Sequence, residues 1–259
     1  MSAEKKKTIV ITRFDPDKDD GRRTEEYEIP VEEDWKVLDA INYIKDEVDP
    51  TVSHRWSCRM AVCGSCGMMV NGEPTLTCKT SLASYGDRVV IEPLANFPVV
   101  RDLVVDLDGF MDKFKKVKPW IVLAKEEAGK ETTKATKEKS DKGTYVQSPE
   151  QLATFKQFSM CINCMLCYSA CPVVANEPEF LGPAAIALGH RYNLDSRDEG
   201  NHERNDIFRD EGTVFSCSFA NECSEVCPKK VDPAAAVNQA KFGAVIDWAK
   251  SFVVPRGGE

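Results

Sequence analysis

Cysteine is the residue type in this sequence best suited to chemistry, and spacing divides the eleven cysteines into three groups. The first group, with the spacing Cys-x4-Cys-x2-Cys-x11-Cys, consists of Cys58, Cys63, Cys66 and Cys78. Plant-type ferredoxins use this spacing to hold a [2Fe–2S] cluster, with three thiolates on one loop and the fourth beyond a hairpin. The alternative is a structural zinc site with four cysteine ligands. Structural zinc sites usually pair two Cys-x2–4-Cys loops, which this spacing does not provide, so it favours iron and sulfur.

The second group has the spacing of bacterial ferredoxins. Cys161, Cys164, Cys167 and Cys171 are followed by Pro172, as Cys-x2-Cys-x2-Cys-x3-Cys-Pro. In two-cluster proteins the fourth cysteine of such a run ligates the other cluster, so a reciprocal run is expected. The third group provides it: Cys217, Cys223 and Cys227-Pro228 fit the same template, with Ala220 where the second cysteine would stand.

This template predicts two ligand sets. Cys161, Cys164 and Cys167, with Cys227 crossing over, would hold a [4Fe–4S] cluster, and the second cluster would be held by Cys171, Cys217 and Cys223. Because alanine has no donor atom, we expect Ala220 to leave one iron position vacant and the second cluster to be [3Fe–4S]. The alternative is a labile [4Fe–4S] cluster whose fourth iron binds water. The vacancy accounts for the odd number of cysteines.

The sequence offers few residues for chemistry other than cluster binding. The histidines, His54, His190 and His202, are not spaced like a metal-binding pair, and their ordinary roles would be packing or surface positions. The sequence has no Gly-x-Gly-x-x-Gly or P-loop motif, so a flavin or nucleotide would have to bind to another chain. We expect no catalytic residue: the chain would carry electrons without breaking bonds. The net charge of −8 argues against a nucleic-acid partner.

The first third of the chain has the pattern of a small β-sheet crossed by one helix. Residues 8–14, 27–30, 68–70 and 87–91 are expected to be strands, and Asn71-Gly72 indicates a hairpin. Trp35, Leu38 and Ile41 have helical spacing. Gly64 and Gly67 are expected to permit tight turns that direct backbone amides at cluster sulfurs.

The rest of the chain is predicted to be helical after a lysine-rich linker. Residues 112–142 contain ten lysines against six acidic residues, and 125–143 suggest a solvated helix or a linker, with a basic partner-binding face as the alternative. Helices are expected from Ser148, over 182–192, and from Asp232 toward Lys250. We therefore divide the chain into a [2Fe–2S] domain (1–110), a linker (111–147) and an α-helical two-cluster domain (148–259).

One residue of the last predicted helix is unusual. Lys241 lies on an apolar stripe whose other members are Val237, Ala240, Ala244, Val245 and Trp248. Its aliphatic stem could cover this surface while the ammonium group reaches water. The alternative is a polar contact to a partner or ligand beside the three-iron end.

Together the three motifs resemble one family, the iron–sulfur subunit of succinate dehydrogenase and fumarate reductase. The similarity covers nearly the whole chain except the linker and is carried by residues 55–67, 161–172, 182–185, 190–193, 195–198 and 223–228. It implies an α+β protein, with an N-terminal β-grasp ferredoxin-like domain and a C-terminal all-α dicluster ferredoxin-like domain.

The resemblance also implies partners and a location. A flavoprotein with covalent FAD would interconvert succinate and fumarate, and electrons would pass between that flavin and a quinone through the [2Fe–2S], [4Fe–4S] and [3Fe–4S] clusters. The last cluster would face one or two membrane-anchor subunits. The chain itself would be a peripheral subunit at the cytoplasmic face of the bacterial cell membrane. It would not bind the dicarboxylate.

Near the quinone the sequence is more similar to one branch of the family. Many ubiquinone-linked members have a tryptophan shortly after the Cys-Pro of the second group, whereas here residues 173–176 are Val-Val-Ala-Asn. The positions that match the quinone surroundings are Pro172, Ser218, Phe219, Asn238 and Lys241. The resemblance thus implies a succinate dehydrogenase subunit that uses menaquinone. The alternatives are the same subunit in a fumarate reductase, another flavin dehydrogenase's subunit or a soluble ferredoxin-type carrier.

Overall fold

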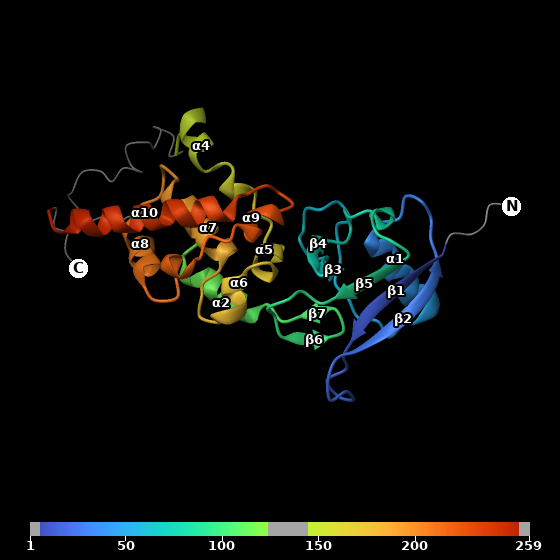
Figure 1. Ribbon diagram of the computed structural model, residues 1–259. Helices are drawn as coiled ribbons and strands as arrows, with labels where there is room; N and C mark the ends of the chain where they lie inside the picture. Colours follow the sequence, from blue (N-terminus) through green and yellow to red (C-terminus); the bar gives the residue numbers. More distant parts are fainter. Residues whose placement is uncertain (1–5, 124–144, 254–259) are drawn as a thin grey trace. The chain divides into compact units, whose positions relative to one another are not determined.

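The computed structural model describes residues 6–123 and 145–253, which form two compact units (Figure 1). The first unit comprises the described part of Met1–Asp108 together with Ile162–Ala170, and the second comprises the described parts of Gly109–Cys161 and Cys171–Glu259. The lysine-rich stretch 125–143 lies outside the described residues. Residues 162–170, from the middle of the second cysteine run, thus belong with the N-terminal unit.

A mixed five-stranded sheet forms the frame of the first unit. Its strands, in the spatial order β2-β1-β5-β3-β4, are β1 (Lys6–Arg13), β2 (Arg23–Pro30), β3 (Gly67–Val70), β4 (Glu73–Leu76) and β5 (Arg88–Glu92). β1 and β5 are parallel, and the other neighbours are antiparallel. Asn71 (φ 49°) and Gly72 (φ 84°) join β3 to β4. A type I′ turn requires positive φ at both of its central residues. Asn71 and Gly72 meet this requirement and form the predicted hairpin turn.

One helical segment covers the sheet, as expected for a β-grasp. It consists of α1 (Val37–Tyr43), which continues as a π-helical turn, η1 (Ile44–Val48). Its apolar side packs with Ile9, Ile11 and Ile91 of the sheet in one core. Trp35, predicted on the helix face, precedes the helix and packs against this core from its edge. The remaining elements of the unit are η2 (Leu82–Ser84), the two-stranded β6 (Val99–Arg101) and β7 (Val104–Val105), and α5 (Leu166–Ser169).

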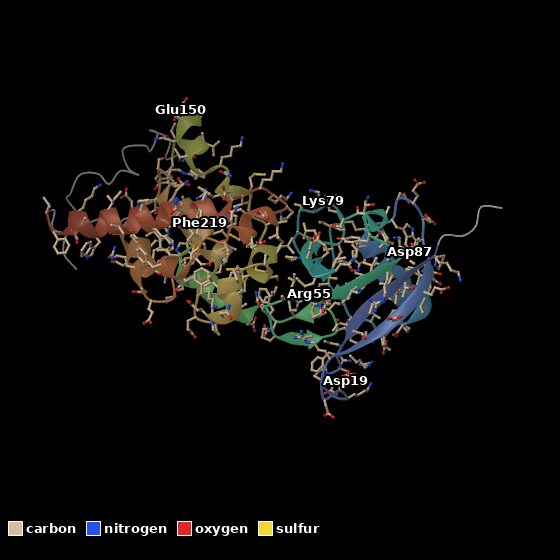
Figure 2. The ribbon with its side chains drawn as sticks, in the orientation of Figure 1. Asp19, Arg55, Lys79, Asp87, Glu150 and Phe219 are labelled. Atoms are coloured by element: carbon tan, nitrogen blue, oxygen red, sulfur yellow. The ribbon has the colours of Figure 1, made fainter. Side chains whose placement is uncertain are left out.

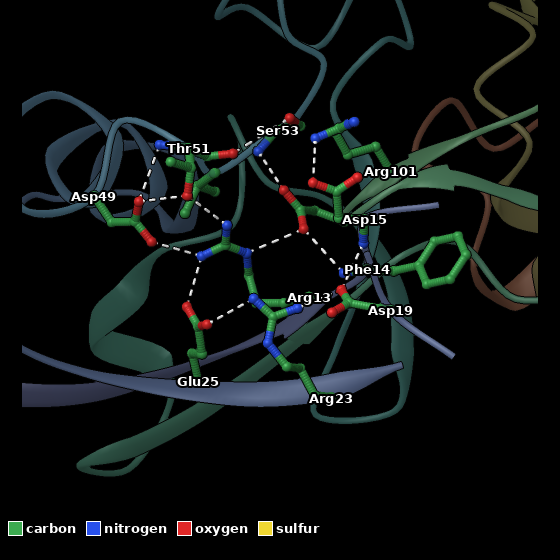
Figure 3. A network of polar contacts seen from close by, with 12 residues as sticks. Arg13, Phe14, Asp15, Asp19, Arg23, Glu25, Asp49, Thr51, Ser53 and Arg101 are labelled. Atoms are coloured by element: carbon green, nitrogen blue, oxygen red, sulfur yellow. Dashed lines mark hydrogen bonds and ion pairs between the residues drawn. The ribbon is translucent and has the colours of Figure 1, made fainter. Parts of the chain in front are cut away.

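A buried arginine connects the sheet to the chain that leads into the first cysteine loop. Arg13, at the end of β1, pairs with Glu25 (2.6 Å), Asp49 (2.6 Å) and Asp102 (3.0 Å), although only 5% of its side chain is exposed (Figure 3). A buried guanidinium needs such carboxylates, because desolvating a lone charge is costly. Asp102 also accepts the backbone N–H of Ser53 at 2.8 Å. The network therefore fixes the chain five residues before Cys58.

The second unit is helical, as predicted. Its elements are α2 (Asp108–Lys116), α4 (Pro149–Phe155), η3 (Phe158–Met160), α6 (Pro172–Asn176), α7 (Pro183–Asn193), α8 (Asn201–Arg209), η4 (Val214–Ser216), α9 (Glu222–Glu225) and α10 (Pro233–Ser251). Ser148 caps α4 and forms a reciprocal capping box with Gln151. Asp232 caps α10 by accepting the amide of Ala235. These sequence signals therefore predicted the helix starts correctly.

The long helix α10 packs against α7 and α8. Val237, Ala240 and Ala244 are buried, as the apolar stripe predicted. Val245 and Trp248, assigned to the same stripe, are exposed by 46% and 51%, so the buried part of the stripe ends at Ala244. The buried position there is Asp247, which accepts hydrogen bonds from side chains on α8. None of the helices within the described ranges is long and apolar enough to span a bilayer.

Candidate metal centres

The cysteines of the first group lie in the loop before β3 and just after β4. In this arrangement the Cys58 thiol lies near the Cys63 thiol, and the Cys66 thiol lies near the Cys78 thiol. A [2Fe–2S] cluster held by four thiolates takes two of them on each iron. Two neighbouring pairs therefore fit a two-iron cluster. The β3–β4 hairpin creates the second pair, because it returns Cys78 to the end of the loop.

Backbone amides surround one of these thiols. The N–H groups of Met60, Val62 and Cys63 each donate to Cys58 Sγ at 3.4 Å. These donors lower the pKa of the Cys58 thiol to about 6, because they stabilise the thiolate. Arg59 (φ 56°) and Ala61 (φ 55°) adopt left-handed conformations in the same loop. Left-handed residues of this kind let neighbouring amides converge on an anion.

The sequence did not identify these donors. From the sequence we expected turns at Gly64 and Gly67 to direct the amides, but the amides that reach Cys58 come from residues N-terminal to both glycines. Gly64 is indeed left-handed, with φ 75°. Gly67 is not, and it begins β3. Positive φ at non-glycine residues is uncommon, so no local sequence signal predicts it at Arg59 and Ala61.

The two thiol pairs differ in their surroundings. Cys66 and Cys78 are buried, whereas Cys63 is exposed and Cys58 is half-buried. Burial raises the pKa of the Cys66 thiol to about 11, because desolvation disfavours the thiolate. One side of the predicted [2Fe–2S] centre therefore meets the protein surface, while the other side faces the core.

The cysteines predicted to hold the three-iron cluster lie together in the second unit. Cys171, Cys217 and Cys223 line one pocket, and Ala220 lines it with them. Burial raises the pKa of the Cys171 and Cys223 thiols, and their mutual charge interactions, which include Cys217, contribute in the same direction. Three cysteines and one alanine that line the same pocket are the residues that the template places around a [3Fe–4S] cluster.

The second and third cysteine runs have the same local backbone pattern. In the second run, the left-handed residues are Asn163 (φ 52°) and Met165 (φ 64°), two and four positions after Cys161. In the third run, Phe219 (φ 61°) and Asn221 (φ 69°) hold the corresponding positions after Cys217. A four-residue helix follows each pair, α5 in one run and α9 in the other. The shared backbone supports placing Ala220 at the position equivalent to Cys164.

The four cysteines predicted to hold the [4Fe–4S] cluster come from both units. Cys161 and Cys227 pack against one apolar cluster of the second unit, which contains Phe158 and Val231. The amide of Val231 donates to Cys227 Sγ at 3.3 Å. Cys164 and Cys167 belong to the segment 162–170 of the first unit.

Comparison with known proteins identifies both domain types. Residues 8–112 match the family model of the 2Fe-2S iron-sulfur cluster binding domain, and residues 157–231 match that of the 4Fe-4S dicluster domain. The chain is 49% identical over 251 residues to the fumarate reductase iron-sulfur subunit of Mycobacterium tuberculosis, covering 96% of this chain and 97% of that one. It is 48% identical over 256 residues to that of Escherichia coli O157:H7, covering 99% and 100%.

This chain belongs to the family of fumarate reductase and succinate dehydrogenase iron–sulfur subunits. It is also 36% identical over 237 residues to the succinate dehydrogenase iron-sulfur subunit of Coxiella burnetii, covering 90% and 95% of the two chains. Among solved structures, a chain of the Mycobacterium smegmatis Sdh1 complex in the apo form matches with a TM-score of 0.77 and 27% identity. That match covers 98% of this chain and 100% of the other.

The residues that the family resemblance placed near a quinone lie mostly around the three-thiol pocket. Pro172, Ser218 and Phe219 line it, and Phe219 is 52% exposed (Figure 2). Lys241 Nζ donates to the backbone carbonyl of Cys217 at 2.9 Å. The unusual lysine on α10 therefore makes a polar contact within the chain, beside a predicted cluster ligand. Asn238 is exposed on α10 and is not among the residues that line the pocket.

The three histidines all interact with side chains of this chain. His54 Nε2 lies 2.8 Å from Asn42 Oδ1. His190 Nε2 lies 3.1 Å from Gln239 Oε1, linking α7 to α10. His202 Nδ1 lies 2.5 Å from Asp247 Oδ1, linking α8 to α10. These contacts agree with the packing roles expected from the sequence.

Proposed function

We propose that this chain is the electron relay of a succinate dehydrogenase. It would pass single electrons between the covalent FAD of a partner flavoprotein and a membrane quinone. The observation that carries the proposal is the pocket in which three cysteines converge with Ala220. An eight-iron ferredoxin would have a fourth cysteine there, so the alanine favours a mixed-cluster relay over an ordinary soluble carrier.

The proposed ligand sets follow the motif templates. The [2Fe–2S] cluster would bind to Cys58, Cys63, Cys66 and Cys78, and the [4Fe–4S] cluster to Cys161, Cys164, Cys167 and Cys227. The [3Fe–4S] cluster would bind to Cys171, Cys217 and Cys223. Each cluster accepts and releases one electron at a time, so the series can connect a two-electron flavin to a two-electron quinone. A labile [4Fe–4S] cluster with water at the Ala220 corner is the competing assignment for the last position.

The proposed partners are the flavoprotein at the [2Fe–2S] end and one or two membrane-anchor subunits at the three-iron end. Relatives that are subunits of such enzymes and span nearly the same length support this assignment. We place the complex at the cytoplasmic face of the bacterial cell membrane, with this chain as a peripheral subunit. The dicarboxylate would bind to the flavoprotein.

At the quinone end, we propose that Pro172, Ser218, Phe219, Asn238 and Lys241 lie near the headgroup. The exposed ring of Phe219 and the Lys241 ammonium group beside Cys217 support this placement. We favour menaquinone, because Val-Val-Ala-Asn follows Pro172 where ubiquinone-linked relatives often have tryptophan.

The direction of electron flow has two candidates. The relatives at 48–49% identity are fumarate reductase subunits, and a succinate dehydrogenase subunit shares 36%. Quinol oxidation coupled to fumarate reduction is therefore the second candidate function. Both directions use the same ligands, because a cluster's potential depends on hydrogen bonding, charge and exposure and not on the thiolates alone.

The proposal is tested by purifying the chain from its native membrane and recording low-temperature EPR spectra in oxidised and reduced states. We expect co-purification with a flavoprotein and membrane subunits, an oxidised [3Fe–4S] signal and a reduced [2Fe–2S] signal. Isolation as a soluble monomer without flavin would contradict the assignment. Assays of succinate–quinone reduction and quinol–fumarate reduction on the same complex separate the two directions.

A further inference from the structure

Residues 162–170 are attached to the first unit by their own set of contacts. Asn96 Nδ2 donates to the carbonyls of Tyr168 at 2.9 Å and Ser169 at 3.2 Å. Ser169 Oγ donates to the carbonyl of Ala95 at 3.0 Å. The ring of Tyr168 packs against that of Phe97, with centroids 5.8 Å apart. This segment carries Cys164 and Cys167, so two predicted [4Fe–4S] ligands are held by the domain of the [2Fe–2S] centre.

Two glycines, Gly64 and Gly67, leave no room for a side chain between their own backbone and this segment. A Cβ atom on Gly64 would lie 2.8 Å from the carbonyl oxygen of Ile162 and 3.0 Å from Cα of Cys164. A Cβ atom on Gly67 would lie 3.0 Å from the carbonyl oxygen of Cys164. These distances are shorter than van der Waals contact, so a side chain at either position would push the two backbones apart.

Both glycines are next to predicted cluster ligands. Gly64 follows Cys63 and Gly67 follows Cys66, and the residue they both approach is Cys164. Cys63 and Cys164 also line one pocket of this unit. The backbone that carries two [2Fe–2S] ligands is therefore in direct contact with the backbone that carries a [4Fe–4S] ligand.

We propose that Gly64 and Gly67 are positioning residues that set the separation of the [2Fe–2S] and [4Fe–4S] clusters. Electron tunnelling weakens exponentially with distance, so even a small outward shift slows transfer. In the step itself, one electron leaves the reduced [2Fe–2S] cluster, which is oxidised, and enters the [4Fe–4S] cluster, which is reduced. No bond is made or broken. The inference rests on the proposed function and its ligand sets.

Gly67→Ala is the most direct test. Gly67 does not have a left-handed conformation, so the added methyl group brings bulk without strain from positive φ. Gly86→Ala is the matched control, because a Cβ at that position would have no atom within 4 Å apart from those of its chain neighbours. Asn96→Asp is a second variant, farther from the ligands. It keeps the side-chain shape but replaces the amide donor to the two carbonyls by an acceptor.

The readout is EPR relaxation of the fully reduced complex, because spin–spin coupling between two clusters decreases steeply with their separation. Iron and spin counts establish that both clusters are present. With both present, we expect Gly67→Ala to lose part of the relaxation enhancement of the [2Fe–2S] signal and to transfer electrons several-fold more slowly. Gly86→Ala should match the wild type. If Gly67→Ala does not assemble its clusters, the positioning role is tested by the EPR relaxation of Asn96→Asp, which should show the same loss.

Unchanged relaxation in the deciding variant, with both clusters present, would overturn the positioning role. That failure differs from failure of the proposed function. If the wild-type complex lacked a [2Fe–2S] or [4Fe–4S] signal, the ligand sets themselves would be wrong.

Discussion

Arg13 Nε donates to Asp102 Oδ1 at 3.0 Å, although the two residues are 89 positions apart in the chain. The same carboxylate accepts the backbone N–H groups of Phe14 at 3.0 Å and Ser53 at 2.8 Å. Asp102 is buried in the turn between β6 and β7, where it has a φ of 45°. One carboxylate thus joins β1, the β6–β7 turn and the chain that enters the first cysteine loop.

Removing this carboxylate should destabilise the protein strongly. Asp102→Ala leaves a buried guanidinium with fewer partners and leaves the half-buried amides of Phe14 and Ser53 without this acceptor. Breaking a buried ion pair in this way costs about 3 kcal/mol. Urea unfolding of the full chain measures the loss of unfolding free energy. Glu26→Ala is the control, because its ion pair with Arg88 is exposed and is worth less than about 1 kcal/mol. Equal effects of the two substitutions would contradict the structural role of Asp102.

His54 should make stability depend on pH. Burial first, and then the charge of Lys45, lower the pKa of His54 to about 4 from its usual 6.5. The folded state therefore keeps the ring neutral while the unfolded state takes up a proton. The contribution of His54 to stability is complete above pH 6.5 and is lost as the pH falls toward 4.

Unfolding free energies measured between pH 5 and pH 7.5 test this expectation. The wild type should lose up to about 1 kcal/mol per pH unit below pH 6.5. His54→Gln should remove most of this slope, because glutamine does not titrate. A variant with the wild-type slope would show that other groups cause the dependence.

Introducing a thiol at position 220 should change the third proposed cluster. Ala220 lines the pocket with Cys171, Cys217 and Cys223, so Ala220→Cys places a fourth thiol where the proposed [3Fe–4S] cluster would lack a ligand. We expect the oxidised [3Fe–4S] EPR signal to disappear and the iron content to rise. Ser218→Cys is the control, because it adds a thiol to the same loop at a position that is not a ligand in the template. A persistent three-iron signal in fully loaded Ala220→Cys protein would contradict the assignment.

Lys241 should raise the reduction potential of the same cluster. Its ammonium group lies against the Cys217 carbonyl, and a nearby positive charge favours the reduced state of a cluster. Lys241→Met keeps an apolar stem but loses the charge and the hydrogen bond. A change of about 1 kcal/mol corresponds to a fall of about 40 mV for one electron.

A redox titration followed by the three-iron EPR signal measures this shift. Lys241→Arg retains the charge and should remain closer to the wild type than Lys241→Met does. Identical potentials for the wild type and Lys241→Met would show that Lys241 has no electrostatic influence on the centre.

Much of the site could be predicted from residue spacing alone. Cysteine spacing gave the proposed ligands, because the clusters demand thiolates at short, defined intervals, and the proposed vacancy at Ala220 followed from one template. The helix cap at Ser148 and the hairpin turn at Asn71-Gly72 could also be predicted from the sequence, because each depends on interactions between near neighbours in the chain. In contrast, the periodicity of α10 did not reveal Asp247 as a buried position. Its partners, His202 and Arg209, lie on another helix.

The sequence by itself determined which residues carry thiols that could bind iron, and how they are spaced. Only the tertiary structure decided which of those thiols lie together and which backbone groups reach them. No local sequence feature predicts the left-handed conformation of Arg59 and Ala61. The surrounding loop holds them in it, so that backbone amides reach Cys58. Likewise, no neighbouring residue indicates that 162–170 packs on the N-terminal unit. Ligand type is a property of single side chains, whereas contacts between distant segments depend on long-range packing.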